Sequence, residues 1–515
     1  MNSLSSVSVR QRKQQGMALL QSGRVAEAKA VFEALSRDAR RDPDVWHLLG
    51  ACHSMLGDNA RGEECARKAV ALMPSFAGAW VNLGSALLGQ RKLAEAENAL
   101  REAIRRAPAD AQAHSNLGNV YREMKNLDEA EKCYREAIRL QPSFPDALTN
   151  LGLVMQDRGH LTEAAEMHRR ALALSPQHAD ANYNLGYVLM QLGDEKSAVP
   201  FFERVTQLSP ASSRGWKSLA AASARARDPK RAVACYERAL ELDPDDAETL
   251  AALGVCCLSI GDSAKAAVAL TRALELKPED DETRYWLAAA GRGNAPEKMA
   301  PDAVAKLFDG YADKFDAHLV GELRYRAPEM LSAALRRGRG DRAPPLSVAD
   351  LGCGTGLLGA QLRDIAGYLV GVDLAPKMIE KARARGVYDE LAVQDVAEFL
   401  ETTQRHFDAV VATDVFIYIG KLDRIFAATL ARLVAGGLFA FSVEAHPGEE
   451  PYHLRTSGRY AQSLRYLREL SSRYGFTEVS IDPVVLRLEN SVPIDGYVVV
   501  LRRAQSAAGR SAVSS

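Results

Sequence analysis

Three glycines at alternate positions, Gly352, Gly354 and Gly356, are the clearest candidates for chemistry in this 515-residue chain. They follow the short apolar run 346–351 and precede a helical pattern over 357–366. Glycine lets the backbone turn sharply and lets it approach a bound molecule where a Cβ would intrude. The pattern therefore predicts a ligand-binding turn between a buried strand and a helix, the alternative being a turn used for packing alone.

Acidic residues follow the next three apolar runs, each of which is predicted to be a strand. Asp373 comes 21 residues after Gly352, the separation at which an open parallel sheet places an acid that binds ribose hydroxyls. The predicted strands span 368–372, 390–393 and 409–412, and the acids near their ends are Asp373, Asp395 and Asp414. The glycine spacing differs from the dinucleotide pattern Gly-x-Gly-x-x-Gly, because Gly359 comes too late to be its third glycine.

Residues from about 304 to 503 resemble the class I S-adenosylmethionine-dependent methyltransferases. The matching segments are Asp350-Leu351-Gly352-Cys353-Gly354-Thr355-Gly356, Asp373, Asp395-Val396, Thr413-Asp414-Val415, 433–443 and the lead-in Phe308-Asp309-Gly310-Tyr311-Ala312 with Phe315-Asp316. The resemblance implies a Rossmann-like α/β domain with a seven-stranded sheet and a helical cap. It also implies S-adenosylmethionine as the cofactor.

The resemblance further assigns roles to individual residues. The glycine turn would accommodate the methionine part of the cofactor, with Asp350 orienting it from behind. Asp373 would bind the ribose and Asp395 would meet the adenine. The complete set of implied cofactor-binding residues is Asp350, Gly352, Cys353, Gly354, Gly356, Asp373, Leu374, Asp395, Val396 and Asp414.

Methyl transfer from a sulfonium requires an acceptor held in line, and it requires a base only if the acceptor must lose a proton. Candidates for positioning or proton transfer are Tyr418, His446 and His453, although each also fits a surface or packing position. The polar segment 444–458 is predicted to be a loop that could form an acceptor pocket. A helix over 459–474 and a strand hairpin of 477–488 and 497–501 are predicted to follow.

Small residues recur in the first half of the chain at a constant step of 34 residues. They are Gly16, Gly50, Gly84, Gly118, Gly152, Gly186, Ala220, Gly254 and Ala288. The period resembles the tetratricopeptide repeat, in which small side chains lie where two helices cross. We predict an all-α superhelix of eight repeats with a capping helix over 9–290, joined by a linker over 291–303. Repeats followed by such a domain are similar to a group of bacterial proteins described as predicted methyltransferases containing tetratricopeptide repeats.

Four asparagines occupy one position of consecutive repeats: Asn82, Asn116, Asn150 and Asn184. In such superhelices the first helix of each repeat lines a long concave groove. A ladder of carboxamides there could pair with the amide groups of an extended peptide, as in the similar superhelix of O-linked N-acetylglucosamine transferases. The alternative is that these asparagines are solvated or structural.

Composition narrows the classes of partner. The 65 basic and 66 acidic residues give a net charge of −1, so no general attraction to nucleic acid or to an anionic membrane is expected. Signal-peptide and membrane-span patterns are not seen, and seven scattered cysteines lack zinc or disulfide spacing, so we expect a cytoplasmic protein without a metal site. Residues 1–8 and 504–515 are predicted to be disordered.

The leading hypothesis is a methyltransferase whose repeats recruit a protein or peptide, as the acceptor or as its carrier. One alternative is a scaffold in which the second domain is regulatory or vestigial. Another is a small-molecule methyltransferase that its repeats localise or cause to self-associate. The sequence leaves the acceptor undetermined, because this fold serves many acceptor atoms.

Overall fold

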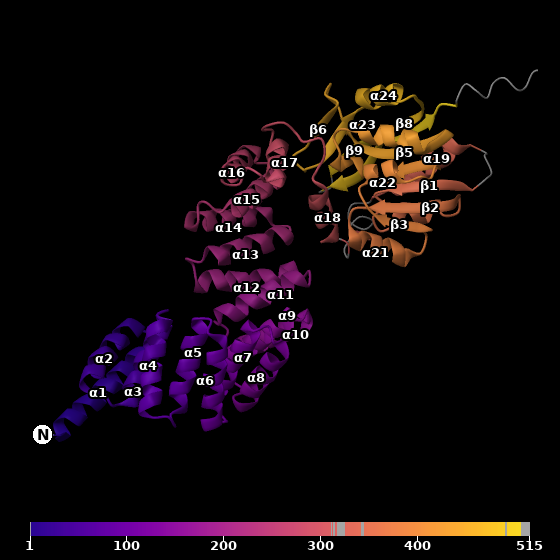
Figure 1. Ribbon diagram of the computed structural model, residues 1–515. Helices are drawn as coiled ribbons and strands as arrows, with labels where there is room; N and C mark the ends of the chain where they lie inside the picture. The colour runs from indigo at the N-terminus through magenta and orange to yellow at the C-terminus, as the bar shows by residue number, and fades with distance from the viewer. Residues whose placement is uncertain are drawn as a thin grey trace, which may run out of the picture. The chain divides into compact units, whose positions relative to one another are not determined.

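The computed structural model describes residues 2–310, 312, 315–316, 325–340, 345–489 and 492–505, with side chains from residue 9 onward. Tyr311 of the predicted cap and most of the predicted tail, from residue 506, lie outside the described residues. The chain divides into two compact units, Met1–Leu242 and Asp243–Ser515. The second unit therefore contains the last repeat helices as well as the sheet (Figure 1).

The first unit consists of antiparallel helix pairs that repeat with the predicted period. Its helices are α1 (Asn2–Gln21), α2 (Val25–Asp38), α3 (Pro43–Met55), α4 (Asn59–Leu72), α5 (Ala77–Gly89), α6 (Leu93–Arg106), α7 (Ala111–Glu123), α8 (Leu127–Leu140), α9 (Pro145–Asp157), α10 (Leu161–Leu174), α11 (Ala179–Gln191), α12 (Glu195–Leu208), α13 (Ser213–Arg225) and α14 (Pro229–Leu242). Helix α1 begins at Asn2, so the helical region starts before the predicted boundary at residue 9.

The periodic glycines have the packing role that the repeat pattern predicts. A Cβ on Gly84 would lie 2.5 Å from Cγ of Leu100, and a Cβ on Gly118 would lie 2.7 Å from the ring of Tyr134. Both partners lie on the second helix of the same repeat. The two helices of a pair can approach closely only because the crossing point carries no side chain.

The second unit begins with helices of the same repeat type, α15 (Ala247–Ser259), α16 (Ser263–Leu276) and α17 (Asp281–Ala289). The segment 291–303, predicted to be a linker, then runs into α18 (Pro301–Asp309). Part of this segment is hydrogen-bonded to the α/β domain: the Met299 amide donates to the Tyr418 carbonyl at 2.9 Å, and the Gly420 amide donates to the Glu297 carbonyl at 2.8 Å. We call residues 296–299 the strap.

The α/β domain is built on one mixed sheet, as predicted for a Rossmann-like fold. Its strands are β1 (Leu346–Leu351), β2 (Ala366–Asp373), β3 (Glu390–Val393), β4 (Phe407–Ala412), β5 (Leu433–His446), β6 (Tyr452–Leu454), β7 (Tyr460–Ser463), β8 (Phe476–Glu489) and β9 (Val492–Arg503). The parallel strands follow the order β3-β2-β1-β4-β5. Strand β9 then pairs antiparallel to β5, and β8 pairs antiparallel to β9. These seven strands match the predicted seven.

The hairpin of β6 and β7 is an addition that the sequence analysis missed. Strand β7 pairs parallel to the last residues of β5, and β6 pairs antiparallel to β7. The predicted loop over 444–458 is therefore wrong at both ends, since β5 continues to His446 and β6 begins at Tyr452. The predicted helix over 459–474 is also too long, because Tyr460–Ser463 is a strand and α24 covers only Leu464–Arg473. Pairing with β5 overrides local helical preference in this buried segment.

Helices cover both faces of the sheet. One apolar cluster joins α19 (Ala327–Arg339) and α20 (Leu357–Leu362) to one face, through residues such as Leu335 and Val348. The opposite cluster joins α22 (Val396–Thr402), α23 (Asp423–Arg432) and α24 through residues such as Phe399, Phe426 and Leu470. Helix α21 (Pro376–Arg385) follows β2. This double cover buries the strands and leaves their carboxyl ends to form a site.

None of the helices in the described part of the chain is both long and apolar enough to cross a membrane.

Candidate functional site

A cavity of about 360 Å³ lies at the carboxyl ends of the parallel strands. This volume falls in the range of small-molecule sites, about 300–1,000 Å³. The residues that line it are Lys298, Met299, Pro301, Val304, Leu307, Phe308, Phe315, Tyr325, Gly352, Gly354, Asp373, Leu374, Asp395, Val396, Thr413, Asp414, Val415, Ile417, Tyr418, Ile419, Arg459 and Arg487. Seven of the ten predicted cofactor residues are among them.

The glycine turn after β1 adopts backbone conformations that favour glycine. Gly352, Gly354 and Gly356 have φ angles of 63°, 52° and 89°. A Cβ on Gly352 would also lie only 2.3 Å from Cγ2 of Val415, which follows β4. The turn is therefore held both by its left-handed conformation and by the close approach of a neighbouring loop.

Asp373, at the end of β2, is tied to the glycine turn. Its Oδ2 accepts a hydrogen bond from the Gly354 amide at 2.9 Å, and its Oδ1 accepts one from the Ala375 amide at 2.9 Å. Burial raises the pKa of this carboxyl above its usual range, although the amide donors oppose that shift. Each oxygen of the ionised carboxylate keeps a second lone pair, so Asp373 can still accept hydrogen bonds from hydroxyl groups of a ligand.

Asp395 follows β3 and caps the N-terminus of α22. Its Oδ1 accepts from the amides of Ala397 and Glu398 at 2.9 and 3.2 Å, and its Oδ2 lies 3.0 Å from Nζ of Lys298 on the strap. Burial acts to raise the pKa of Asp395, but Lys298 and the amide donors outweigh it and the pKa is lowered. The strap thus contributes a cation to the edge of the cavity.

Three predicted cofactor residues, Asp350, Cys353 and Gly356, lie behind the cavity wall and do not line it. Asp350 is completely buried and accepts a hydrogen bond from the Tyr388 hydroxyl at 2.7 Å, while its Oδ1 has no partner among the described residues. Burial raises the pKa of Asp350 to about 7. The buried Cys353 fills space beside Gly371, where a Cβ would lie 2.9 Å from its Sγ. These residues support the turn from the rear.

Asp414, after β4, connects the cavity to a buried arginine. The Asp414 amide donates to Oγ of Ser442 at 2.9 Å, and that hydroxyl donates to Oδ1 of Asp414 at 3.0 Å. Nη1 of Arg487 donates to Oδ2 of Asp414 at 2.9 Å. Arg487 is 3% exposed, and it also donates to Glu444 and, through Nε at 2.8 Å, to Glu489.

A second arginine, Arg459, immediately precedes β7 and also lines the cavity. It pairs with Glu489, and Tyr418, Tyr325 and Thr413 line the cavity as well. Burial raises the pKa of both tyrosines, so both phenols are protonated at neutral pH. This end of the cavity therefore presents hydroxyl and guanidinium donors.

The three catalytic candidates differ in whether they line the cavity. Tyr418 lines the cavity, but His446 and His453 do not. Their rings stack on each other outside it, with centroids 5.3 Å apart. The prediction of these histidines depends on a loop over 444–458 at the site, whereas His446 ends β5 and His453 lies in β6.

Sequence reasoning missed Lys298, Tyr325, Arg459 and Arg487. Arg487 carried one usable signal: a charged residue between leucines in a predicted strand is expected to be buried only with a partner. The other three lie in segments without a recognisable pattern, and only the fold brings them to the cavity.

In the first unit, three of the four ladder asparagines bond to the preceding repeat. Nδ2 of Asn82 donates to the His47 carbonyl at 3.0 Å, Nδ2 of Asn116 donates to Oγ of Ser85 at 2.8 Å, and Nδ2 of Asn150 donates to Oδ1 of Asn119 at 3.0 Å. No such bond is seen at Asn184 among the described residues. The carboxamides therefore join the first helices of neighbouring repeats. These bonds use some of the amide donors that were expected to pair with a peptide.

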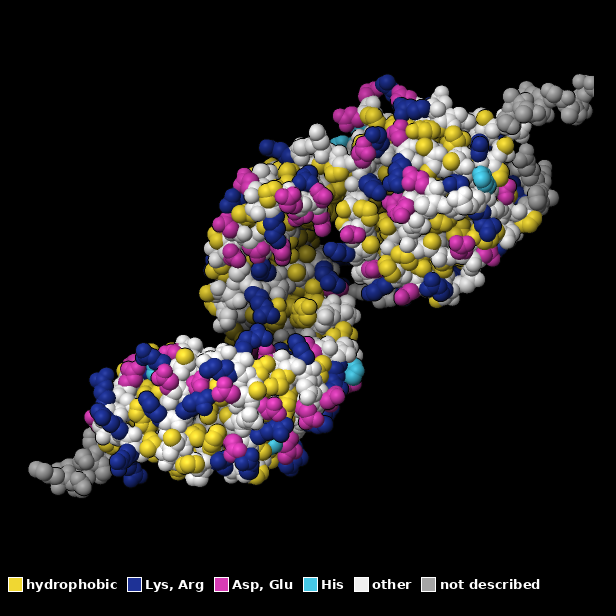
Figure 2. Space-filling view, in the orientation of Figure 1, with side chains coloured by type: hydrophobic (Ala, Val, Ile, Leu, Met, Phe, Trp, Pro, Cys, Tyr) yellow, Lys and Arg dark blue, Asp and Glu magenta, His cyan; other side chains and the backbone are white. Residues whose placement is uncertain are grey.

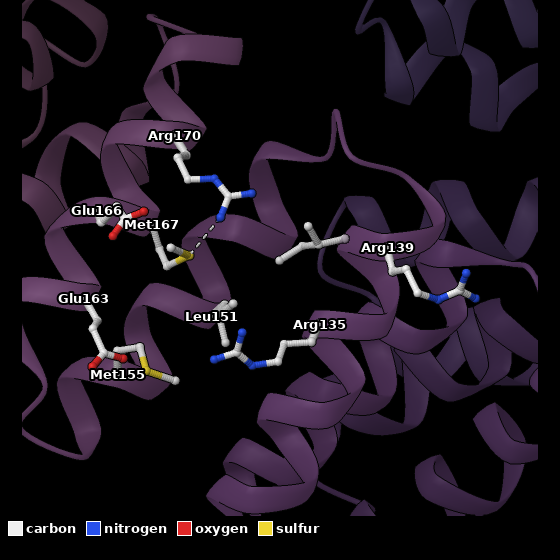
Figure 3. Close-up of a pocket in the computed structure, with 9 residues that line it drawn as sticks. Arg135, Arg139, Leu151, Met155, Glu163, Glu166, Met167 and Arg170 are labelled. Carbon is white, nitrogen blue, oxygen red and sulfur yellow. Dashed lines mark hydrogen bonds between the residues drawn. The ribbon is translucent and has the colours of Figure 1, made fainter.

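A cavity of about 350 Å³ lies between α8, α9 and α10 (Figure 3). Leu151, Met155 and Met167 supply apolar side chains, and Arg135, Arg139 and Arg170 surround them with Glu163 and Glu166. Figure 2 shows basic and acidic side chains interspersed over the visible face of both units. The charges on this face are mixed, in keeping with the near-zero net charge.

Comparison with known proteins identifies both regions. A family model described as the cilia and flagella-associated protein 70 C-terminal domain, a tetratricopeptide-repeat model, matches residues 1–205 and 105–320. A methyltransferase domain model matches residues 348–437. This family normally uses S-adenosylmethionine.

Relatives with assigned names match the second region. Human methyltransferase-like protein 27 is 38% identical over 117 residues, covering 21% of this chain and 46% of that protein. The malonyl-[acyl-carrier protein] O-methyltransferase of Geobacter sulfurreducens is 38% identical over 145 residues, covering 27% of this chain and 52% of that protein. The chain thus spans about half the length of these relatives. A solved tetratricopeptide-repeat structure, YrrB, covers 36% of this chain and 97% of its own at 24% identity, with a TM-score of 0.35.

Proposed function

Because the chain belongs to the tetratricopeptide-repeat proteins and carries a methyltransferase domain, we propose that it transfers a methyl group from S-adenosylmethionine to an acceptor bound in the cavity of the second unit. The observation that supports this most is the position of Asp373. Its carboxylate is fixed by the amide of the glycine turn and lines the same cavity as that turn. Asp373 can therefore bind a ribose hydroxyl while the glycine turn contacts the methionine part of the same ligand.

The residues present fit the cofactor. The open lone pairs of Asp373 accept hydrogen bonds from the ribose hydroxyls, and Leu374 and Val396 supply apolar contact for the base beside Asp395. Gly352 and Gly354 allow the backbone to approach the methionine part. When bound, S-adenosylmethionine supplies an electrophilic methyl group, and the protein's remaining task is to hold the acceptor in line with it.

Calorimetric titration of the full chain with S-adenosylmethionine and S-adenosylhomocysteine tests this proposal. We expect saturable binding of both compounds. Asp373→Asn should weaken binding by about 10- to 100-fold, because it removes hydrogen bonds from a charged group, each contributing about 1.5–3 kcal/mol. Glu380→Gln, on the exposed face of α21, is the matched control and should leave binding unchanged. A wild-type chain that binds neither compound at millimolar concentration would contradict the proposal.

We further propose that the repeats of the first unit bind a protein partner that is the acceptor or carries it. Tetratricopeptide repeats commonly bind peptides or proteins. Three of the ladder asparagines already bond to the preceding repeat. We therefore expect the partner to be recognised by the remaining hydrogen-bonding groups and the other side chains of the repeat surface, and not by a ladder of unengaged carboxamides. Comparing turnover of the native acceptor by the full chain and by residues 243–515 tests recruitment, since equal turnover would favour a methyltransferase that its repeats only localise.

A further inference from the structure

The two arginines lie at the opposite end of the cavity from the acids that would bind the nucleoside. Along the sheet edge, Asp395 follows β3, the glycine turn follows β1 and Asp414 follows β4. Neighbouring strands lie about 4.8 Å apart, so the three intervals from β3 to β4 separate Asp395 from Asp414 by about 14 Å. Arg487 contacts Asp414 from β8, beyond the region needed for an adenosyl group.

This far end offers hydrogen-bond donors from two guanidinium groups. A guanidinium has five N–H groups, and the described partners of Arg487 account for three of them, so two remain. Arg459 is less enclosed and has a partly exposed side chain. Both arginines line the cavity, whereas Glu444 and Glu489, which pair with them, do not.

The acid at this end is already engaged. Asp414 lines the cavity, but its Oδ1 accepts from the Ser442 hydroxyl and its Oδ2 accepts from Arg487. The hydroxyls of Tyr325 and Tyr418 are protonated donors, since burial raises the pKa of both. A group entering this end therefore meets two guanidiniums, whose described partners are the lining residue Asp414 and, outside the lining, Glu444 and Glu489.

In the described lining, Asp414 is the carboxylate at this end, and both of its oxygens already accept hydrogen bonds. Among the described residues that line the cavity there is no histidine, and Lys298, the one lysine, pairs with Asp395 at the other end. Among the described residues at this end, an acceptor that must lose a proton during transfer could give it only to Asp414, and would have to displace one of its hydrogen-bond donors. A carboxylate, with a pKa near 4, is already deprotonated at neutral pH and needs no base.

Resting on the proposed function, we propose that the methyl acceptor is a carboxylate held by Arg459 and Arg487, and that the product is a methyl ester. One carboxylate oxygen uses a lone pair to form the new bond to the methyl carbon. The carbon–sulfur bond breaks, and its electron pair stays on sulfur. The products are the ester and S-adenosylhomocysteine, and no proton is transferred.

The carboxylate of the cofactor's own methionine part has the same chemistry as the proposed acceptor. The test separates these two sources by filling the cofactor site first. The full chain is saturated with S-adenosylhomocysteine and then titrated with hexanoate and with hexanamide, which has the same shape without the charge. We expect hexanoate to bind at least about tenfold more tightly, because charge-assisted bonds to guanidinium are roughly twice as strong as neutral ones.

Two variants test whether the preference for hexanoate arises from the arginines of the cavity. Arg459→Gln should abolish the preference for hexanoate over hexanamide. Arg455→Gln is the control, because Arg455 precedes the same turn and pairs with Glu444 at 2.8 Å but does not line the cavity. It should retain the preference. Arg459 is chosen over Arg487 because removing a fully buried partner of an ion network endangers folding.

Each other result overturns the carboxylate proposal in a distinguishable way. Equal affinity for hexanoate and hexanamide would overturn it while leaving the methyltransferase proposal intact. If Arg459→Gln weakens S-adenosylhomocysteine but not 5′-methylthioadenosine, which lacks the amino-acid part, the arginine serves the cofactor and the proposal fails. A wild-type chain that does not bind S-adenosylhomocysteine at all overturns both proposals.

The chemical signature of the product gives a second measurement. Incubating the full chain with methyl-tritiated S-adenosylmethionine and an extract of its source cells should label an acceptor. Mild alkali hydrolyses a methyl ester, so the label should become volatile as methanol. A label that withstands alkali belongs to an amine, an ether or a carbon acceptor and would contradict a carboxylate.

Discussion

The repeats of the first unit and the α/β domain of the second join their residues over very different distances along the chain. Asn150 bonds to Asn119, 31 residues away, in the adjacent repeat. Arg487 bonds to Asp414 across 73 residues, and Lys298 reaches Asp395 across 97. A repeat array is stabilised mainly by contacts between neighbours, whereas the cavity is assembled from many segments at once. Damage should therefore stay local in the first unit and spread in the second.

The largest effect is expected from Arg487→Met. The change leaves Glu444, which is 1% exposed, without one of its partners, and it also releases Asp414. Removing one member of a buried ion network costs about 3–5 kcal/mol of the free energy of unfolding. Hydrogen exchange of β4, β5 and β8 should measure this loss in all three strands.

Arg468→Met provides the comparison for this variant. Arg468 pairs with Glu478 across a more exposed surface, with Nε 3.1 Å from Oε2. Surface pairs contribute little, so a change within about 0.5 kcal/mol is expected. Similar losses in the two variants would show that the buried network has no special role.

A pH-dependent effect of about 3 kcal/mol is expected from Asp350. Burial raises its folded pKa to about 7, whereas an unfolded aspartate has a pKa of about 3.9. The folded state therefore binds more protons between these values, so this contribution is complete below pH 4 and is lost as pH rises through 7. Asp350→Asn cannot titrate. The free energy of unfolding of the wild type should fall by about 3 kcal/mol more than that of the variant between pH 5 and 8 in urea titrations.

Asp350 is the last residue but one of β1, directly before the glycine turn. Parallel curves for the wild type and Asp350→Asn would mean that the carboxyl titrates as an ordinary aspartate. In that case burial behind the glycine turn would not disfavour the ionised carboxylate of Asp350.

The smallest effect is expected from Asn150→Ala. The change removes one hydrogen bond between neighbouring first helices, a loss of about 0.5–1.5 kcal/mol. Hydrogen exchange should accelerate in α7 and α9 and remain unchanged in repeats farther along the first unit. Asn184→Ala is the control, because Asn184 makes no comparable bond among the described residues. Exchange that accelerates throughout the first unit would show that the loss of one bond does not stay local in the repeats.

Predictions from local sequence patterns agree with the structure where one short segment contains the whole structural feature. The strand 346–351, the three glycines and the acid after β2 were all predicted, since a strand, a turn and its spacing are set by residues close in sequence. The repeat pattern succeeded for the same reason. His446 and His453 do not line the cavity, because the position of 444–458 depends on strand pairing with distant residues.

By itself, the sequence determined two kinds of domain, the period of one and the glycine turn of the other, because periodicity and glycine conformation are short-range properties. Tertiary structure alone decided which side chains complete the cavity. The strap's Lys298, Arg459 just before β7 and Arg487 on β8 come from separate segments, and their positions at the cavity arise from strand order and burial. A charged side chain far along the chain becomes part of a site only when folding removes it from water beside a partner.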